Sequence, residues 1–290
     1  MEISSIDNYE RKKVDINDSF MSYIDSGNGD VTLFIHGNPT SSFLWRNIIP
    51  SIDIISRCIA PDLIGMGNSG KPKNCGYTFL EHYDYLSEFV ENVIPQGKIT
   101  LVIHDWGSAL GFHWASNNPE RIKGIVYMEA LVRPVTWEEW PENARNIFNL
   151  LRSDAGEELI LEKNIFVERI LPNSAINGVS DSAMEIYRNP YSLPETRLPT
   201  LIWPREIPIS GEPQHMVEII NNYAEFMNTS KFPKLFINAD PGSILIGAQR
   251  EFCRQWPNQK EVTVKGLHFI QEDSPNEIGD EINKWLLEID

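Results

Sequence analysis

The chain has 290 residues, of which 41% are hydrophobic and 10% aromatic, enough for one large core or for one core with an insertion. Its 41 acidic and 25 basic side chains give a formal net charge of −16, which argues against nucleic acid or an anionic membrane surface as a partner. Three scattered cysteines fit neither a disulfide framework nor a zinc site, and no signal peptide or membrane-length apolar run is evident, so we expect a cytoplasmic protein.

The first half of the chain alternates short apolar runs with amphipathic stretches. Strands are predicted over residues 31–35, 55–60, 99–103 and 122–128, and helices over residues 43–52, 79–94 and 106–117. Runs that are apolar throughout are typical of strands buried on both faces of a parallel sheet. The alternation therefore predicts an α/β fold, with a mostly parallel central sheet flanked by helices on both sides.

The pattern changes after Leu131, where strands give way to helices and prolines. Helices are predicted over residues 137–151, 154–170 and 180–188, and the proline-rich stretch 190–213 is predicted to be a loop. The alternation then resumes, with helices over 215–227, 247–255 and 275–289 and strands over 234–239 and 261–264. We therefore expect a core of residues 1–132 and 214–290 and a helical cap of residues 133–213, with the ligand between them.

An aspartate follows the third predicted strand, where a sharp turn leads into a helix. Residues 104–107 read His-Asp-Trp-Gly, and a strand, a small-residue turn and a helix are the setting of a nucleophile elbow, which usually carries serine. A lone aspartate here could simply cap the helix. However, the carboxylate of Asp105 is already an anion at neutral pH and suits displacement at a saturated carbon, which leaves an ester on the enzyme. The pattern predicts alkyl transfer onto Asp105.

A candidate base and its partner follow later strands. His268 stands just past the last predicted strand, whereas the other five histidines flank turns or lie on helices. Glu129 ends the strand over 122–128, where an unpaired carboxylate would be costly and an imidazole would be a fitting partner. Asp240, after the strand over 234–239, is the rival for this role, although a turn before Pro-Gly also explains it.

Two hydrogen-bond donors are predicted beside Asp105. Asn38 lies in the His-Gly-Asn-Pro sequence after the first predicted strand, where this architecture supplies an oxyanion-hole N–H. Trp106 follows the aspartate, and its indole can donate but not accept, although core packing is its alternative role. Because neither group readily gives up a proton, the pair suits a leaving group that departs as a bare anion, such as halide.

No pattern in the sequence indicates a cofactor or a metal. A dinucleotide-binding glycine pattern does not follow the first strand, and neither a phosphate-binding loop nor a metal-spaced His/Cys cluster occurs. The glycine-rich residues 65–70 precede polar coil and not a helix, so they are predicted to form a turn. We expect no cofactor and no metal.

Taken together, these segments resemble the haloalkane dehalogenases of the α/β-hydrolase superfamily. The resemblance is to the subgroup with Asn and Trp as halide donors and Glu as catalytic acid, and it includes similarity to lindane-pathway members at residues 233–239. It covers nearly the whole chain from about residue 30. Its motifs are residues 36–42, 61–67, 104–112, 127–130, 203–209 and 268–275.

The resemblance implies a role for each of five residues. Asp105 would be the nucleophile, His268 the base and Glu129, in preference to Asp240, the catalytic acid, while Asn38 and Trp106 would bind the halide. It also implies an apolar substrate pocket lined by Pro39, Phe148, Phe166, Ile170, Trp203, Pro204, Ile207, Leu267 and Phe269.

Substrate and partners follow from the same resemblance. The substrate would be a small apolar halogenated compound and a halide ion the product, and the protein would act as a monomer with at most weak self-association. Because no arginine stands at the motif positions that bound the pocket, charged haloacids are expected to be poor substrates. A coelenterazine-type luciferase and an epoxide hydrolase share much of this constellation and are the alternatives.

Overall fold

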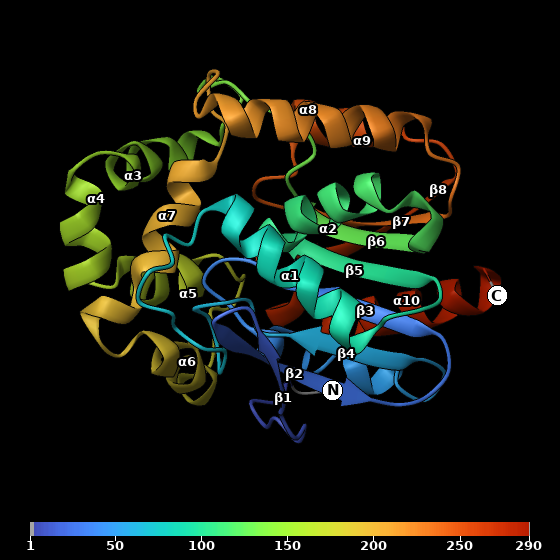
Figure 1. Cartoon of the computed structure of the whole chain (residues 1–290). Helices are drawn as coiled ribbons and strands as arrows, with labels where there is room; N and C mark the ends of the chain where they lie inside the picture. The colour runs from blue at the N-terminus through green and yellow to red at the C-terminus, as the bar shows by residue number, and fades with distance from the viewer. Residues whose placement is uncertain (1–2, 290) are drawn as a thin grey trace.

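An eight-stranded sheet runs through the centre of the molecule in the computed structural model, which describes residues 3–289 (Figure 1). The strand order is β1-β2-β4-β3-β5-β6-β7-β8. The first two strands pair antiparallel to each other, β2 pairs antiparallel to β4, and all later pairings are parallel. The strands are β1 (Lys12–Ile16), β2 (Ser19–Ser26), β3 (Val31–Ile35), β4 (Arg57–Pro61), β5 (Ile99–Asp105), β6 (Ile122–Ala130), β7 (Lys234–Pro241) and β8 (Gln259–Gly266).

The six predicted strands all lie in this sheet, and the predicted α/β class is confirmed. The hairpin of β1 and β2 was not predicted. Its strands lie at the sheet edge and mix polar with apolar side chains, so they carry no continuous apolar run. The hairpin extends the sheet beside β4, far from the strands that carry the candidate catalytic residues.

Helices cover both faces of the sheet (Figure 1). On one face α2 contacts both α1 and α8, and on the other α10 contacts β7 and β8. Among residues 3–289, none of the helices combines the length and the apolar character needed to cross a membrane. The core helices are α1 (Phe79–Val93), α2 (Trp106–Asn117), α8 (Gln214–Thr229), α9 (Gly247–Cys253) and α10 (Pro275–Ile289).

Local sequence explains why α1 begins where it does and why one predicted helix does not form. Thr78 and Glu81 form a reciprocal capping box at the start of α1. In contrast, the predicted helix over residues 43–52 is wrong, because the structure has two short 3₁₀ turns, Ser42–Trp45 and Ile49–Ser51. Pro50 lies inside the second turn and disfavours α-helical backbone at Ile49, the residue before it.

The segment between β6 and α8 forms a helical layer at one end of the sheet, on the left of Figure 1. The predicted helix over residues 154–170 is interrupted at Asn164, whose φ is +50°. The predicted loop over 190–213 is also partly wrong, since α7 lies within it, with Pro199 near its start, where a missing N–H costs little. The helices are α3 (Glu142–Arg152), α4 (Ala155–Glu157), α5 (Leu171–Asn173), α6 (Asp181–Arg188) and α7 (Leu198–Glu206), with π-helical turns Glu158–Glu162 and Phe166–Ile170.

A buried ion pair ties this layer to the core. The guanidinium of Arg46 donates two hydrogen bonds to the carboxylate of Glu272, both at 2.7 Å, and the Tyr187 hydroxyl of α6 donates to the same carboxylate. The side chains of Arg46 and Glu272 are 1% and 4% exposed. Because a charge left alone at this depth is costly, the three groups should stabilise the contact between α6 and the core.

Replacing Glu272 by glutamine should therefore lower the free energy of unfolding by about 3–5 kcal/mol, since it leaves Arg46 buried without a countercharge. The matched control is Glu261→Gln, which breaks the half-exposed pair with Arg254 and should cost no more than about 1 kcal/mol. Denaturant unfolding of both variants measures the difference. Equal losses in the free energy of unfolding would show that the buried ion pair contributes no more to stability than the half-exposed pair.

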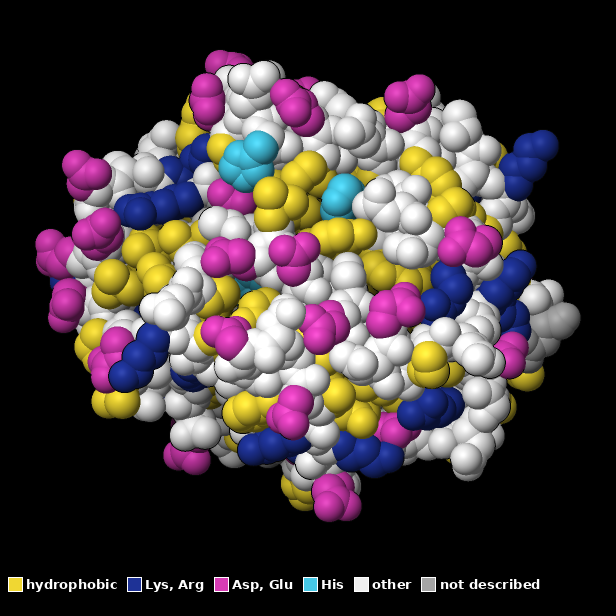
Figure 2. Space-filling model, viewed as in Figure 1, with side chains coloured by type: hydrophobic (Ala, Val, Ile, Leu, Met, Phe, Trp, Pro, Cys, Tyr) yellow, Lys and Arg dark blue, Asp and Glu magenta, His cyan; other side chains and the backbone are white. Residues whose placement is uncertain are grey.

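The surface carries the excess of acidic side chains that the composition predicts. On the face seen in Figure 2, Asp and Glu are distributed over the whole outline and are not gathered into one patch. With a net charge of −16, the field near this surface repels anions in general, so a small anion or an anionic substrate needs a local cation to be held.

Candidate active site

Asp105 lies at the sharp turn between β5 and α2, near the middle of the sheet. Its φ of +50° is left-handed, a conformation that non-glycine residues rarely adopt outside functional turns. The turn is tight enough to require glycine nearby, because a Cβ on Gly107 would lie 2.1 Å from the carbonyl oxygen of Ile35. A Cβ on Gly37 would likewise lie 2.1 Å from Oδ1 of Asp105. The packing therefore presents the Asp105 carboxylate at the end of the strand.

The Asp105 carboxylate is held in its charged form. The backbone N–H of Asn38 donates to Oδ1 at 2.7 Å, and Nε2 of His268 lies 3.3 Å from Oδ2. Burial acts to raise the pKa of Asp105, but the hydrogen bond and charge of His268 and the backbone N–H of Trp106 outweigh it and hold that pKa below its usual value. The group is therefore an anionic nucleophile at neutral pH.

Glu129 reaches His268 because β6 bulges at this point. In the pairing of β5 with β6, His104 lies opposite Met128 and Asp105 opposite Ala130, so Glu129 is the extra residue, and its φ is +40°. Its carboxylate lies 3.2 Å from Nδ1 of His268 and also accepts from the backbone N–H groups of Ser243 and Ile244. Glu129 is only 1% exposed, so these three donors account for a carboxylate that would otherwise be costly to bury.

His268 thus lies between two carboxylates. Burial alone would lower its pKa, but the hydrogen bonds and charges of Asp105 and Glu129 raise the pKa of His268 to about 9. Its backbone is held as well, since Nε2 of the buried His104 bonds to the His268 carbonyl at 2.8 Å. Asp240, the rival partner in the sequence analysis, is exposed to solvent at the end of β7. The geometry brings together Asp105, His268 and Glu129.

Two further polar groups beside Asp105 have no protein partner. Both the side-chain nitrogen and oxygen of Asn38 are buried without a hydrogen bond, and the indole N–H of Trp106 donates to no group among residues 3–289. Asn38, Asp105 and Trp106 line the same cavity. An unpaired buried donor such as the Asn38 amide is uncommon and needs an explanation. This amide and the indole N–H of Trp106, both beside a carboxylate, can hold an anion that forms there.

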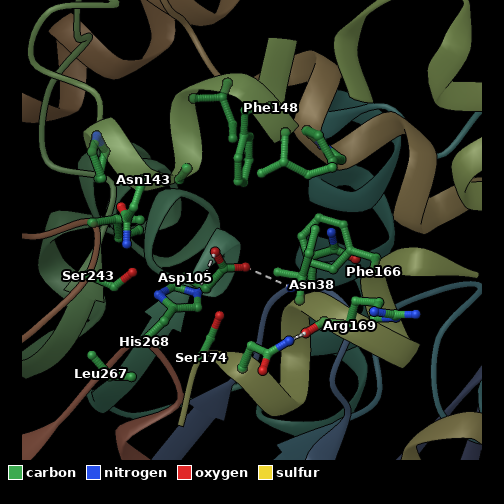
Figure 3. Close-up of a pocket in the computed structure, with 18 of the residues that line it drawn as sticks. Asn38, Asp105, Asn143, Phe148, Phe166, Arg169, Ser174, Ser243, Leu267 and His268 are labelled. Atoms are coloured by element: carbon green, nitrogen blue, oxygen red, sulfur yellow. Dashed lines mark hydrogen bonds and ion pairs between the residues drawn. The ribbon is translucent and has the colours of Figure 1, made fainter. Parts of the chain in front are cut away.

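The cavity has a volume of about 810 Å³ and is shown in Figure 3, where Phe148 and Phe166 lie around Asp105 and His268. Its size is that of a small-molecule site. Of the nine residues predicted to line it, the structure places six in the lining: Phe148, Phe166, Ile170, Pro204, Ile207 and Leu267.

The other three predicted pocket residues, Pro39, Trp203 and Phe269, are buried but lie outside the lining. Trp203 lies behind Trp106, because the two indoles stack with ring centroids 4.6 Å apart and the other stacking neighbour of Trp203 is the buried His82, at 4.3 Å. Phe269 packs edge-on against His268, with centroids 4.8 Å apart. Trp203 and Phe269 thus support residues that line the cavity, so their placement in its wall is corrected.

Several polar lining residues had no recognisable signal in the sequence. They include Asn143, Lys163, Glu168, Arg169 and Ser243, which come from the helical layer and from the loop after β7. In the sequence alone, a charged residue on a short helix that lines a cavity cannot be distinguished from one on the solvent-exposed surface. Ser174, at the end of α5, also lines the cavity.

Replacing Glu129 by glutamine should lower turnover by about 10²-fold or more, because an amide keeps the shape but cannot stabilise a charged imidazole. The NH₂ group of the new glutamine would also lie against the N–H donors of Ser243, Ile244 or His268, and two donors cannot form a hydrogen bond with each other. The matched control is Asp240→Asn at the exposed rival position, which should leave turnover within a factor of two or so. Steady-state kinetics of both variants distinguish the two assignments, and the reverse ranking would favour Asp240.

The chain is similar to known proteins both in sequence and in structure. The family model described as the alpha/beta hydrolase fold matches residues 31–275. The chain is 52% identical to a haloalkane dehalogenase from Sphingobium indicum, covering 93% of each chain, and 45% identical to one from Mycolicibacterium smegmatis, covering 95% and 90%. The solved structure of a haloalkane dehalogenase from Bradyrhizobium elkani matches with a TM-score of 0.94 at 36% identity, covering 97% of this chain and 99% of that chain.

Proposed function

The chain belongs to the haloalkane dehalogenases, and we propose that it hydrolyses carbon–halogen bonds through the residues that line this cavity. The observation that carries the proposal is an anionic aspartate at the turn after β5, with two unpaired donors in the same cavity. The products are an alcohol, a halide ion and a proton.

In the first step, an oxygen of Asp105 attacks the carbon that bears the halogen, from the side opposite the carbon–halogen bond. A carbon–oxygen bond forms, the carbon–halogen bond breaks, and the halide leaves with the bonding electron pair. The indole N–H of Trp106 and the side-chain N–H₂ of Asn38 stabilise the negative charge as it moves onto the halogen. The product of this step is a neutral alkyl ester on Asp105.

In the second step, water attacks the carbonyl carbon of the ester. His268 takes a proton from this water, and Glu129 stabilises the imidazolium that results. The backbone N–H groups of Asn38 and Trp106, which contact the carboxylate in the resting enzyme, are placed to hold the oxyanion of the tetrahedral intermediate. Collapse of the intermediate expels the alkoxide, which takes a proton and leaves as the alcohol.

The charge on Asp105 should make the two steps differ in pH dependence. In the resting enzyme the pKa of His268 is about 9, because two carboxylates surround it. Once Asp105 is esterified, the largest favourable contribution is lost and that pKa must fall, which frees the base at neutral pH. In rapid-quench measurements, halide release in the first turnover should be flat across neutral pH, whereas ester hydrolysis should rise with pH to a midpoint below 9. A midpoint at or above that of the resting enzyme would contradict this account.

The helical segment of residues 133–213 supplies Phe148, Phe166, Ile170 and Pro204 to the lining, whereas Asp105 comes from the sheet. We therefore propose that this segment is the cap and that residues 1–132 and 214–290 are the core. The proposed chemistry uses Asn38, Asp105, Trp106, Glu129 and His268 and needs no residue from a second subunit, so we propose that the protein acts as a monomer. The three free cysteines support the prediction of a reducing, cytoplasmic environment.

The site gives less support to the two alternatives. An epoxide hydrolase needs an acid to protonate the ring oxygen, and the buried tyrosines of residues 133–213, Tyr187 and Tyr191, do not line the cavity. Tyr187 instead bonds to Glu272. A luciferase would consume oxygen and would not explain the unpaired donors beside Asp105.

A halide-release assay tests the proposal directly. Purified enzyme should release bromide from hexyl bromide in many turnovers, whereas Asp105→Ala should release none above background. The same preparations are offered styrene oxide and coelenterazine. Efficient diol formation or light emission, with no bromide released from a panel of haloalkanes, would overturn the proposal.

A further inference from the structure

Four charged side chains besides His268 line the cavity, and three of them have an oppositely charged partner. Asp105 lies beside His268, Lys163 pairs with Glu158 at 2.6 Å, and Glu168 pairs with Arg188 at 2.9 Å. The fourth is Arg169. Among residues 3–289 its guanidinium makes no ion pair and no hydrogen bond, so it is the one lining cation whose charge is not already balanced by a neighbour.

Arg169 stands at the solvent edge of the cavity. It belongs to the π-helical turn Phe166–Ile170, whose end residues also line the cavity with apolar side chains, whereas Arg169 itself is exposed. Asp105, at the other extreme, is only 9% exposed. In Figure 3, Arg169 and His268 lie on opposite sides of Asp105. The cavity thus has a buried reactive end, apolar walls and a free cation where it meets solvent.

This arrangement suits an elongated molecule that has a reactive group at one end, an apolar chain in the middle and a negative charge at the other end. On the basis of the proposed function, we propose that the substrates include haloalkanes with a terminal carboxylate, their carbon–halogen end at Asp105 and their carboxylate at Arg169. The volume of about 810 Å³ is large for a short haloalkane and leaves room for a chain of many carbons. The strongly acidic surface repels an anionic substrate, and the positive charge of Arg169 offsets this repulsion at the solvent edge of the cavity.

The chain length of the substrate decides whether the carboxylate is tolerated. In bromoacetate the carboxylate is next to the reacting carbon, so it would be buried beside Asp105 without a countercharge. In a long chain the carboxylate reaches the solvent edge and meets Arg169. The expectation that haloacids are poor substrates therefore holds for short acids and is reversed for long ones.

The experiment compares bromoacetate, ω-bromohexanoate and ω-bromodecanoate with the methyl ester of each acid. The quantity measured is the ratio of kcat/KM for the acid to kcat/KM for its ester, in the wild type and in Arg169→Gln. For the longest acid this ratio should fall about 3- to 5-fold in the variant, mainly through KM, as expected for an exposed ion pair. For bromoacetate the ratio should be low in both proteins.

Lys163→Gln is the matched control, because it removes another lining cation that Glu158 already neutralises. It should leave the ratio unchanged, whereas Arg169→Glu should lower it further than Arg169→Gln does. An unchanged ratio in Arg169→Gln, or an equal fall in Lys163→Gln, would overturn the inference. Hexyl bromide, which has no carboxylate, distinguishes failure of the proposed function from failure of the proposed role of Arg169. If the wild type does not hydrolyse it, the proposed function is wrong; if the wild type does, the acid-to-ester ratios test Arg169 alone.

Discussion

Replacing His268 by phenylalanine should stop the enzyme after a single turnover, with the alkyl group still esterified to Asp105. In this variant the backbone N–H groups of Asn38 and Trp106 still donate to the Asp105 carboxylate, which attacks as an anion and needs no base to remove a proton first, so the first step can proceed. Hydrolysis of the ester then lacks the group that activates water, which is worth about 10²–10⁴-fold in rate. Mass spectrometry of the variant after incubation with hexyl bromide should show one added hexyl group, located on the peptide that contains Asp105.

A matched control is His113→Phe. His113 lies on α2, packs against Tyr83 at 4.5 Å between ring centroids, and does not line the cavity. This variant should release bromide in many turnovers and accumulate no adduct. Steady multiple-turnover release by His268→Phe would show that another group activates the water.

Replacing Trp106 by phenylalanine should lower dehalogenation by about 10²-fold or more, the usual cost of removing one preorganised donor to a developing anion. Phenylalanine keeps an aromatic ring against Trp203 and removes only the N–H and part of the ring system. Steady-state bromide release measures the loss, and circular dichroism checks that the fold is intact. The fall should appear in the first-turnover halide burst, because the donor acts when the halide departs.

Trp256→Phe distinguishes loss of the donor from loss of packing. Trp256 is also buried with an unpaired indole N–H, but it packs against Phe112 and Tyr127, away from the cavity. Its replacement should affect stability more than turnover. If Trp106→Phe kept wild-type turnover, the indole would be a packing group and the halide site would have to lie elsewhere.

The chemistry could be predicted from the sequence because it lies on the most regular part of the fold. Asp105 and Glu129 end buried strands, and His268 follows the edge strand β8; the carboxyl ends of these parallel strands meet at one edge of the sheet. The side chains of these three residues, two carboxylates and an imidazole, then limit the reactions that a site at this edge can catalyse. The bulge that turns Glu129 toward His268 could not be predicted, since it depends on the register between β5 and β6.

The cavity wall was harder to predict, because it depends on how a helical layer packs over the sheet. Trp203 and Phe269 are aromatic residues in motif segments, yet each packs behind another ring instead of facing the cavity. Arg169 gave no signal, because one cation on a helical turn looks the same in sequence whether it faces open solvent or the rim of a cavity. The rim therefore had to be found from three-dimensional contacts.

A single turnover in water enriched in the heavy oxygen isotope tests the central claim, that Asp105 forms an ester whose carbonyl is attacked by water. With enzyme in excess over hexyl bromide, the labelled oxygen should enter the Asp105 carboxylate, and the hexanol should carry unlabelled oxygen from the protein. Mass spectrometry of the alcohol and of the peptide that contains Asp105 measures both. Label in the alcohol and none in the peptide would contradict the account, because water would then have attacked the substrate carbon directly.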